Sequence, residues 1–259
     1  MSYHAALVAA PAYVLQPTAL LTIVALTVLT LLSSFGALTG SFVIASAAPL
    51  MVAGLRFSIF ALIVRRSHAG QTDLRLGDDE LDPFGVLFAG VRFVFVTLAA
   101  FGPFILVGWS TVPKVATFFM LGESGVSTGE FLLTLLLLAV TFVLPLVALP
   151  GAYAATALGT GCSGINPLVG LLVARRIPGP YFLTLVYLTA FWFASVALTG
   201  GGALAAFSSM VDESEGVAGM LFTMVVFTGL MTLMEVTSML ISARVLGLLT
   251  YHYREELGL

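Results

Sequence analysis

Six long runs of apolar residues dominate the sequence, and short segments between them hold most of the charged positions. A helix that crosses a bilayer needs about 20 mostly apolar residues, and each run meets that length. Irregular backbone exposed to lipid is not tolerated at this depth, so the runs predict α-helices. The predicted spans cover residues 18–38, 41–64, 85–109, 131–150, 181–203 and 217–246. The pattern therefore predicts an all-α fold, a polytopic membrane helical bundle that forms a single integral-membrane domain over 1–259.

Two further segments are apolar but too short to cross. Residues 167–176 end in Arg175 and Arg176 and are typical of a short interfacial or partly re-entrant helix. Residues 1–17 are either a short interfacial segment or disordered. No Lys or Arg precedes Arg56, and the first apolar run is too long for a signal peptide, so we expect the amino terminus to be retained.

The basic residues lie mainly on one side of the predicted bundle, and only Lys114 falls in a loop on the other side. Cytoplasmic loops of membrane proteins carry an excess of Lys and Arg, so both termini are predicted to be cytoplasmic. The residues on the basic side are Arg65, Arg66, Arg75, Arg175, Arg176, Arg244 and Arg254.

The composition indicates an integral membrane protein and excludes several classes of function. Only 9% of residues are charged and 59% are hydrophobic, whereas soluble domains carry roughly 25% charged residues. A net charge of −3 provides no basic surface, so we expect no nucleic-acid partner. The single cysteine, Cys162, excludes an internal disulfide and a cysteine-only metal site. No phosphate loop or dinucleotide motif is present, and we expect no cofactor and no metal.

Several short motifs resemble an uncharacterised family of six-span prokaryotic membrane proteins, which is distantly similar to Yip-type and glycerophosphodiesterase membrane domains. The motifs, in chain order, are "LDPFG", "AGVRF", "VLPLVALPG", "INPL" with Asn166 and Pro167, "RRIPGPY" and "ARVLGLLTYHYREELG". The resemblance covers nearly the whole chain. It implies a fold, a topology and a prokaryotic cytoplasmic (inner) membrane, but no activity and no catalytic residues.

Three charged residues lie inside predicted spans. Arg56 lies nine residues before Arg65, and Glu235 lies nine residues before Arg244, so each is roughly 13 Å from the cytoplasmic edge. Arg92 is at a similar depth in the third span. A lone charge at the bilayer centre costs about 2.5–3.5 kcal/mol on insertion scales. We therefore expect Glu235 to pair with Arg56, Arg92 or both.

This charge group has three interpretations: a structural clamp, a site for an anion or lipid phosphate, or arginines that extend separately to the interface. The clamp is favoured. The cytoplasmic interfacial residues that we expect to contact lipids or partners are Arg65, Arg66, Asn166, Pro167, Arg175 and Arg176.

The sequence "GCSG" at residues 161–164 resembles the nucleophile motif of rhomboid proteases. That chemistry needs a base within hydrogen-bond reach of Ser163, and no histidine lies in the last predicted span. We expect a flexible turn and no enzyme activity. Two functions remain: a non-enzymatic subunit or scaffold of an inner-membrane assembly, in contact with membrane lipids and other subunits, or a small transporter for an anionic solute or lipid.

Overall fold

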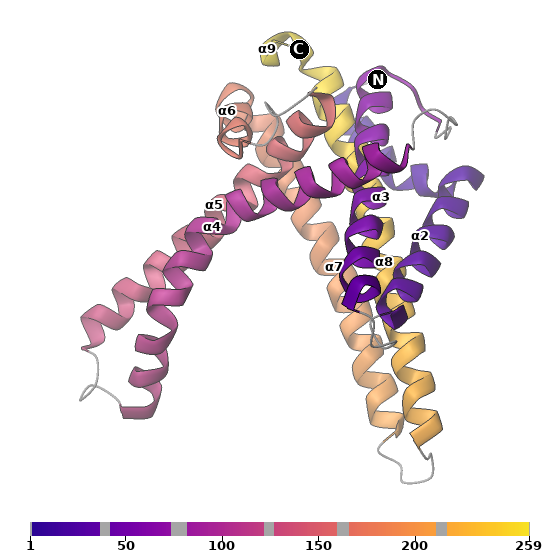
Figure 1. The fold of residues 1–259 in the computed structure, drawn as a ribbon. Helices are drawn as coiled ribbons and strands as arrows, with labels where there is room; N and C mark the ends of the chain where they lie inside the picture. Colours follow the sequence, from indigo (N-terminus) through magenta and orange to yellow (C-terminus); the bar gives the residue numbers. More distant parts are fainter. Residues whose placement is uncertain are drawn as a thin grey trace. The chain divides into compact units, whose positions relative to one another are not determined.

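The computed structural model describes residues 2–36, 42–73, 82–121, 127–159, 166–210 and 217–258, and every regular element in these ranges is helical (Figure 1). The six long helices are α2 (Pro17–Gly36), α3 (Phe42–His68), α4 (Pro83–Leu121), α5 (Thr128–Leu158), α7 (Pro178–Met210) and α8 (Val217–His252). Within the described residues, six helices are long and apolar enough to cross a membrane. The all-α fold with six candidate spans is therefore confirmed.

Five of the six long helices, α3, α4, α5, α7 and α8, continue at their carboxyl ends past the apolar windows from which they were predicted. The largest difference is in α4, which continues to Leu121 although the apolar window ends at residue 109. Pro103 and Pro113 lie inside α4, and Pro145 and Pro150 lie inside α5. A proline in a helix removes one backbone hydrogen bond without always ending the helix, because neighbouring groups can satisfy the freed carbonyl. Hydropathy detects where lipid contact ends, and the helices themselves continue past that point.

Local sequence explains where two of these helices begin. Asp82 precedes α4, and its carboxylate accepts hydrogen bonds from the backbone N–H groups of Phe84 (3.1 Å) and Gly85 (2.8 Å). Ser127 and Glu130 form a capping box at the start of α5, in which each side chain accepts from the other residue's backbone N–H. Both arrangements satisfy N–H groups that have no partner within the helix.

Serine and threonine hydroxyls inside the spans mostly donate to a carbonyl one turn back in their own helix. Thr22, Thr97, Thr141 and Thr237 each bond the carbonyl four residues earlier, at 2.7–2.8 Å. Hydrocarbon offers no water to such a hydroxyl, so the bond within the helix removes the penalty of leaving it unpaired. These residues therefore fit a lipid environment without needing a partner helix.

The chain divides into two compact units, and each is described by itself. The first comprises residues Met1–Val91 and Gly179–Leu259, and the second comprises Arg92–Pro178. In the first unit α3 packs along α8, and α2 packs against both helices. Contacts between Arg56 and Glu235 and between Ser67 and Arg244 show that α3 and α8 run parallel. This direction agrees with the predicted topology, in which both helices end on the same side.

The amino-terminal segment is ordered and helical. It forms α1 (Tyr3–Ala9) and a 3-10 helix, η1 (Ala10–Leu15), and both pack against α8. The Tyr3 hydroxyl hydrogen-bonds to Thr184 of α7, and its ring contacts His252 and Tyr253. Burial raises the pKa of Tyr3 to about 12. Of the two alternatives for residues 1–17, the structure supports an ordered segment, and it places the two ends of the chain near each other (Figure 1).

The second unit contains a small core between α4 and α5. Val96, Ala100, Leu149 and Ala152 are buried together, and the Tyr153 hydroxyl lies 2.9 Å from that of Thr97. The short helix α6 (Leu168–Arg176) packs directly on α5. A short helix at residues 167–176 was expected from the sequence, and its close packing on another helix was not.

Gly170 allows this close packing, because a Cβ added there would lie 1.8 Å from the carbonyl oxygen of Ala148. Gly170→Ala should therefore separate α6 from α5 and lower stability by about 1–3 kcal/mol, the range for overpacked sites. Gly102→Ala is the control, since a Cβ at Gly102 would meet nothing within 4 Å. The thermal unfolding midpoint of each variant in detergent gives the comparison, and equal midpoints would contradict the close approach.

Candidate functional site

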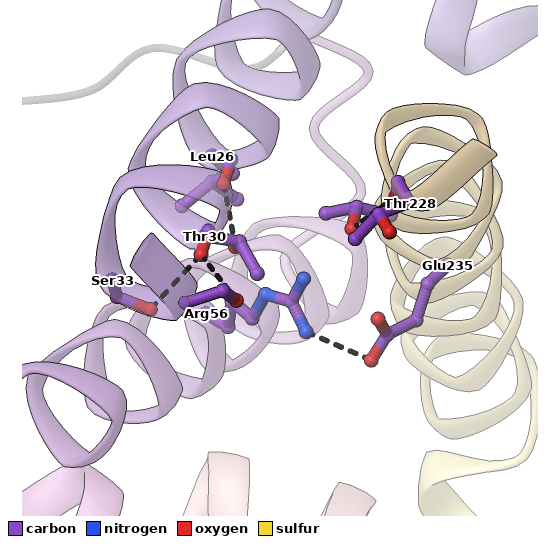
Figure 2. A network of polar contacts seen from close by, with 8 residues as sticks. Leu26, Thr30, Ser33, Arg56, Thr228 and Glu235 are labelled. Atoms are coloured by element: carbon purple, nitrogen blue, oxygen red, sulfur yellow. Dashed lines mark hydrogen bonds and ion pairs between the residues drawn. The ribbon is translucent and has the colours of Figure 1, made fainter. Parts of the chain in front are cut away.

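An ion pair joins α3 and α8 in the first unit. Arg56 Nη1 donates to Glu235 Oε1 at 2.8 Å, and Figure 2 shows the guanidinium directed toward the carboxylate. The pairing of Glu235 with Arg56, expected from their equal depth, is present. The bond is single, so the two-pronged geometry that an arginine can offer a carboxylate is not formed here.

Both partners lie near the middle of their helices. Arg56 is fourteen residues after the start of α3 and twelve before its end, and Glu235 is eighteen residues after the start of α8 and seventeen before its end. At 1.5 Å per residue, each charge is about 18 Å or more from either end of its helix. Both residues also lie inside candidate spans. The pair therefore lies near the middle of two candidate spans, and the middle of a bilayer is where an isolated charge is least favourable.

The two side chains differ in their surroundings. The Arg56 side chain is 17% exposed, whereas that of Glu235 is 65% exposed. Arg56 Nε and Nη2 are buried and, within the described part of the chain, have no hydrogen-bond partner. The nearby hydroxyls of Thr30 and Ser33 on α2 donate to carbonyls of their own helix, at 2.7 and 3.0 Å (Figure 2). The arginine is thus enclosed and only partly satisfied, while the glutamate faces outward from the unit.

Arg92 belongs to the second unit and has partners there. Its Nη2 donates to the carbonyl oxygens of Thr156 (3.1 Å) and Gly159 (3.3 Å), at the carboxyl end of α5. A cation at this position satisfies carbonyls that have no partner within the helix and is favourable to the helix dipole. These contacts give Arg92 a structural role that was not foreseen, and its pairing with Glu235 stays a prediction.

The residues assigned to the cytoplasmic interface lie at helix ends. Arg65 and Arg66 are in the last turn of α3, and Arg175 and Arg176 are exposed in the last turn of α6. The Asn166 side chain accepts from the Leu168 N–H at 3.0 Å, and Pro167 is the N-cap of α6. Asn166 and Pro167 therefore begin α6, and the four arginines occupy positions where a positive charge is compatible with the helix dipole.

Arg244 of α8 contacts three other segments, although the sequence indicated for it only a position near the cytoplasmic edge of the last span. Its Nη1 donates to Ser67 Oγ (2.8 Å) and to the Gln71 carbonyl (2.6 Å), and its guanidinium carbon lies 5.2 Å from the centre of the Tyr13 ring. Gly70, with φ of 77°, provides the turn after α3 that brings the Gln71 carbonyl within reach. An arginine near the end of a predicted span is usually assigned to the membrane interface. Nothing in the sequence indicated that Arg244 would contact Ser67, Gln71 and Tyr13.

Other candidate chemistry falls partly outside the described residues. The "GCSG" sequence, including Cys162 and Ser163, lies in the interval between 159 and 166, which the structure does not describe. Among the described residues, no group of three or more His, Cys, Asp or Glu side chains is arranged to hold a metal ion. The cavity in α5 is an open apolar groove lined by Ala139, Val140, Val143, Leu144 and Val147.

Comparison of the chain with models of known protein families, with curated proteins and with solved structures finds no match. The class of the protein therefore rests on its own features. Six helices have the length and apolar composition of spans, and many large apolar side chains lie on their exposed surfaces. These features define a polytopic α-helical membrane protein.

Proposed function

We propose that the chain is a non-enzymatic subunit or scaffold of a membrane assembly. The observation that carries this proposal is the Glu235 side chain, which is 65% exposed at the middle of an apolar helix. Lipid tails cannot solvate a carboxylate, and intramembrane charged residues almost always face protein or water. A partner that covers this face would remove the carboxylate from hydrocarbon.

Lipids are the second proposed partner. Large apolar side chains are exposed along α5 and α7, among them Leu133, Leu136, Phe182 and Phe193. The open groove on α5 is lined by apolar residues alone and has the chemistry to take an acyl chain. By the positive-inside rule, we place the arginine-rich helix ends at the cytoplasmic face. The resemblance noted above favours the cytoplasmic membrane of a prokaryote.

A transporter for an anionic solute or lipid is the alternative, favoured by the unpaired donors of Arg56. An anion would need to reach Nε or Nη2, and both atoms are buried. The described groove on α5 is lined by apolar residues alone, so it offers an anion no polar contact. The subunit proposal needs only the exposed surface that the structure already has.

Extraction from native membranes with a mild detergent or a lipid-preserving polymer tests the proposal. We expect particles larger than one 27.2 kDa chain with its lipid, of fixed composition through two different purification steps. A particle with one copy of the chain and no stoichiometric protein companion would contradict it. Anion uptake by vesicles that contain the purified chain, lost in Arg56→Lys while the yield is unchanged, would instead support the transporter.

A further inference from the structure

A polar face runs along α8 through Glu235. We call Thr228, Met231, Glu235, Ser238 and Ser242 the α8 polar face. They are spaced three and four residues apart, so they lie within an arc of about 80° on a helix of 3.6 residues per turn. Thr228 is exposed, Met231 is 39% exposed, and Ser238 and Ser242 are half-buried. Four polar side chains and one methionine thus follow one line along α8, and Thr232, Thr237 and Arg244 lie on other sides of the helix.

The α8 polar face is offset from the residues of α8 that pack most closely on α3, although Glu235 also reaches Arg56 of that helix. Val236, Leu240 and Ala243 are fully buried, and Gly247 lies against Ser67 and Val64 of α3. These residues lie about 80–140° around the helix from Glu235. Close packing on α3 therefore leaves Thr228, Met231 and Glu235 exposed, with Ser238 and Ser242 partly accessible.

The spacing and composition of this face are those of a helix–helix contact in a membrane. Alternation of three and four residues follows the 3.5-residue period at which two helices pack with a left-handed twist. Serine and threonine are enriched where transmembrane helices meet, because small side chains allow close approach and hydroxyls bond across the contact. Methionine adapts to irregular partners.

We propose that the partner on the α8 polar face is a second copy of this chain, with the two α8 helices packed in parallel. This inference rests on the proposed function and names the partner. Copies of one membrane protein insert with the same orientation, so their α8 helices are parallel. The face is also complementary to itself, since it carries a carboxylate acceptor at Glu235 and a hydroxyl donor one turn away at Ser238.

Charge does not oppose this pairing. Each Glu235 keeps its own Arg56 at 2.8 Å, so each copy brings a neutral pair to the contact. The Ser238 hydroxyl of one copy can then donate to the Glu235 carboxylate of the other. Two glutamates without counter-ions would repel each other at this depth, whereas the ion pair allows them to approach.

Cysteine cross-linking in vesicles that contain only the purified chain tests the proposal. In a Cys162→Ala background, Ser238→Cys and Ser242→Cys are compared with Val226→Cys, an exposed position (43%) that lies about 120–180° around α8 from Ser238, Glu235 and Ser242. We expect mild oxidation to shift Ser238→Cys from 27.2 kDa to twice that mass, while Val226→Cys stays monomeric at the same lipid dilution. Equal cross-linking of both positions, or none at Ser238 and Ser242, would overturn the inference.

A second measurement avoids the need for cross-linking. Ser238→Leu with Ser242→Leu should reduce the dimer fraction counted by single-molecule photobleaching, without lowering the unfolding midpoint of the chain. An unchanged dimer fraction would overturn the inference. If the native particle contains other proteins while the purified chain is monomeric, this inference fails and the proposed function stands. If the native particle has a single chain, the proposed function fails as well.

Discussion

Glu235→Leu is expected to be among the most destabilising single substitutions in α8, because it leaves the enclosed Arg56 guanidinium without its counter-ion. Arg56 Nε and Nη2 already lack partners, so the Nη1–Oε1 bond is the only described bond of this guanidinium. Removing one member of a buried ion pair typically costs 3–5 kcal/mol. Glu235 is 65% exposed, and we therefore expect a smaller loss of about 2–3 kcal/mol, near the insertion cost of a lone charge.

The double variant Arg56→Met with Glu235→Leu is the matched control. Replacing both charges by apolar side chains of similar size removes the pair without leaving an isolated charge, so it should be more stable than Glu235→Leu alone. Unfolding in mixed micelles, followed for the wild type, both single variants and the double variant, completes a double-mutant cycle. If the double variant is as unstable as the sum of the two single variants, the ion pair makes no contribution as a pair.

Glu235→Gln separates the structural role from an anion site. The amide keeps an acceptor for Arg56 Nη1 but removes the negative charge, so a structural clamp predicts an intermediate loss of stability. If Arg56 is instead part of an anion site, Glu235→Gln should increase the affinity for anions, because the glutamine no longer neutralises the charge of Arg56. The clamp predicts lower stability without tighter anion binding, and the anion site predicts tighter binding. Binding of inorganic phosphate to the purified wild type and Glu235→Gln distinguishes the two.

Hydropathy and a depth argument predicted much of this structure. The length of the apolar runs alone indicated six spans, because a helix needs about twenty apolar residues to cross the hydrocarbon core of a bilayer. The pairing of Arg56 with Glu235 followed from their equal distances to Arg65 and Arg244, since parallel helices with equal offsets bring those levels together. The same argument proposed Arg92 as a partner, although Arg92 binds the carbonyls of Thr156 and Gly159. Depth identifies which charges share a level, but it does not specify direction around each helix.

Close contacts between helices were not predictable from the sequence. Gly54, Gly170 and Gly247 each lie where an added Cβ would overlap a neighbouring helix, but Gly102 and Gly108 lie in open surroundings in a similarly apolar sequence. A glycine in a membrane helix is common whether or not it makes a contact. The contacts of the amino-terminal segment could not be predicted either. Tyr3 and Tyr13 belong to a stretch with no charge and little periodicity, so the sequence does not indicate which face packs on the other helices.

Gly247→Ala is expected to lower stability through the contact that sets the register of α3 against α8. A Cβ at Gly247 would lie 2.3 Å from Ser67 Cβ and 2.8 Å from the Val64 carbonyl oxygen, so the helices must shift. Ser67 Oγ also accepts from Arg244, and a shift there lengthens that hydrogen bond. The combined loss should be about 1–3 kcal/mol, as for other overpacked positions.

Gly229→Ala provides a control on the same helix. Its added Cβ would lie 3.7 Å from Leu31 Cδ1, an ordinary contact, and alanine favours a helix over glycine by about 1 kcal/mol. Gly229→Ala should therefore be neutral or slightly stabilising in the same unfolding experiment. Opposite signs for the two substitutions would show that α3 and α8 are held at a fixed separation near Ser67. Arg56 and Glu235 lie on these same two helices, so their ion pair depends on the helix spacing. Equal effects at Gly229 and Gly247 would mean that the close approach at Gly247 does not set that spacing.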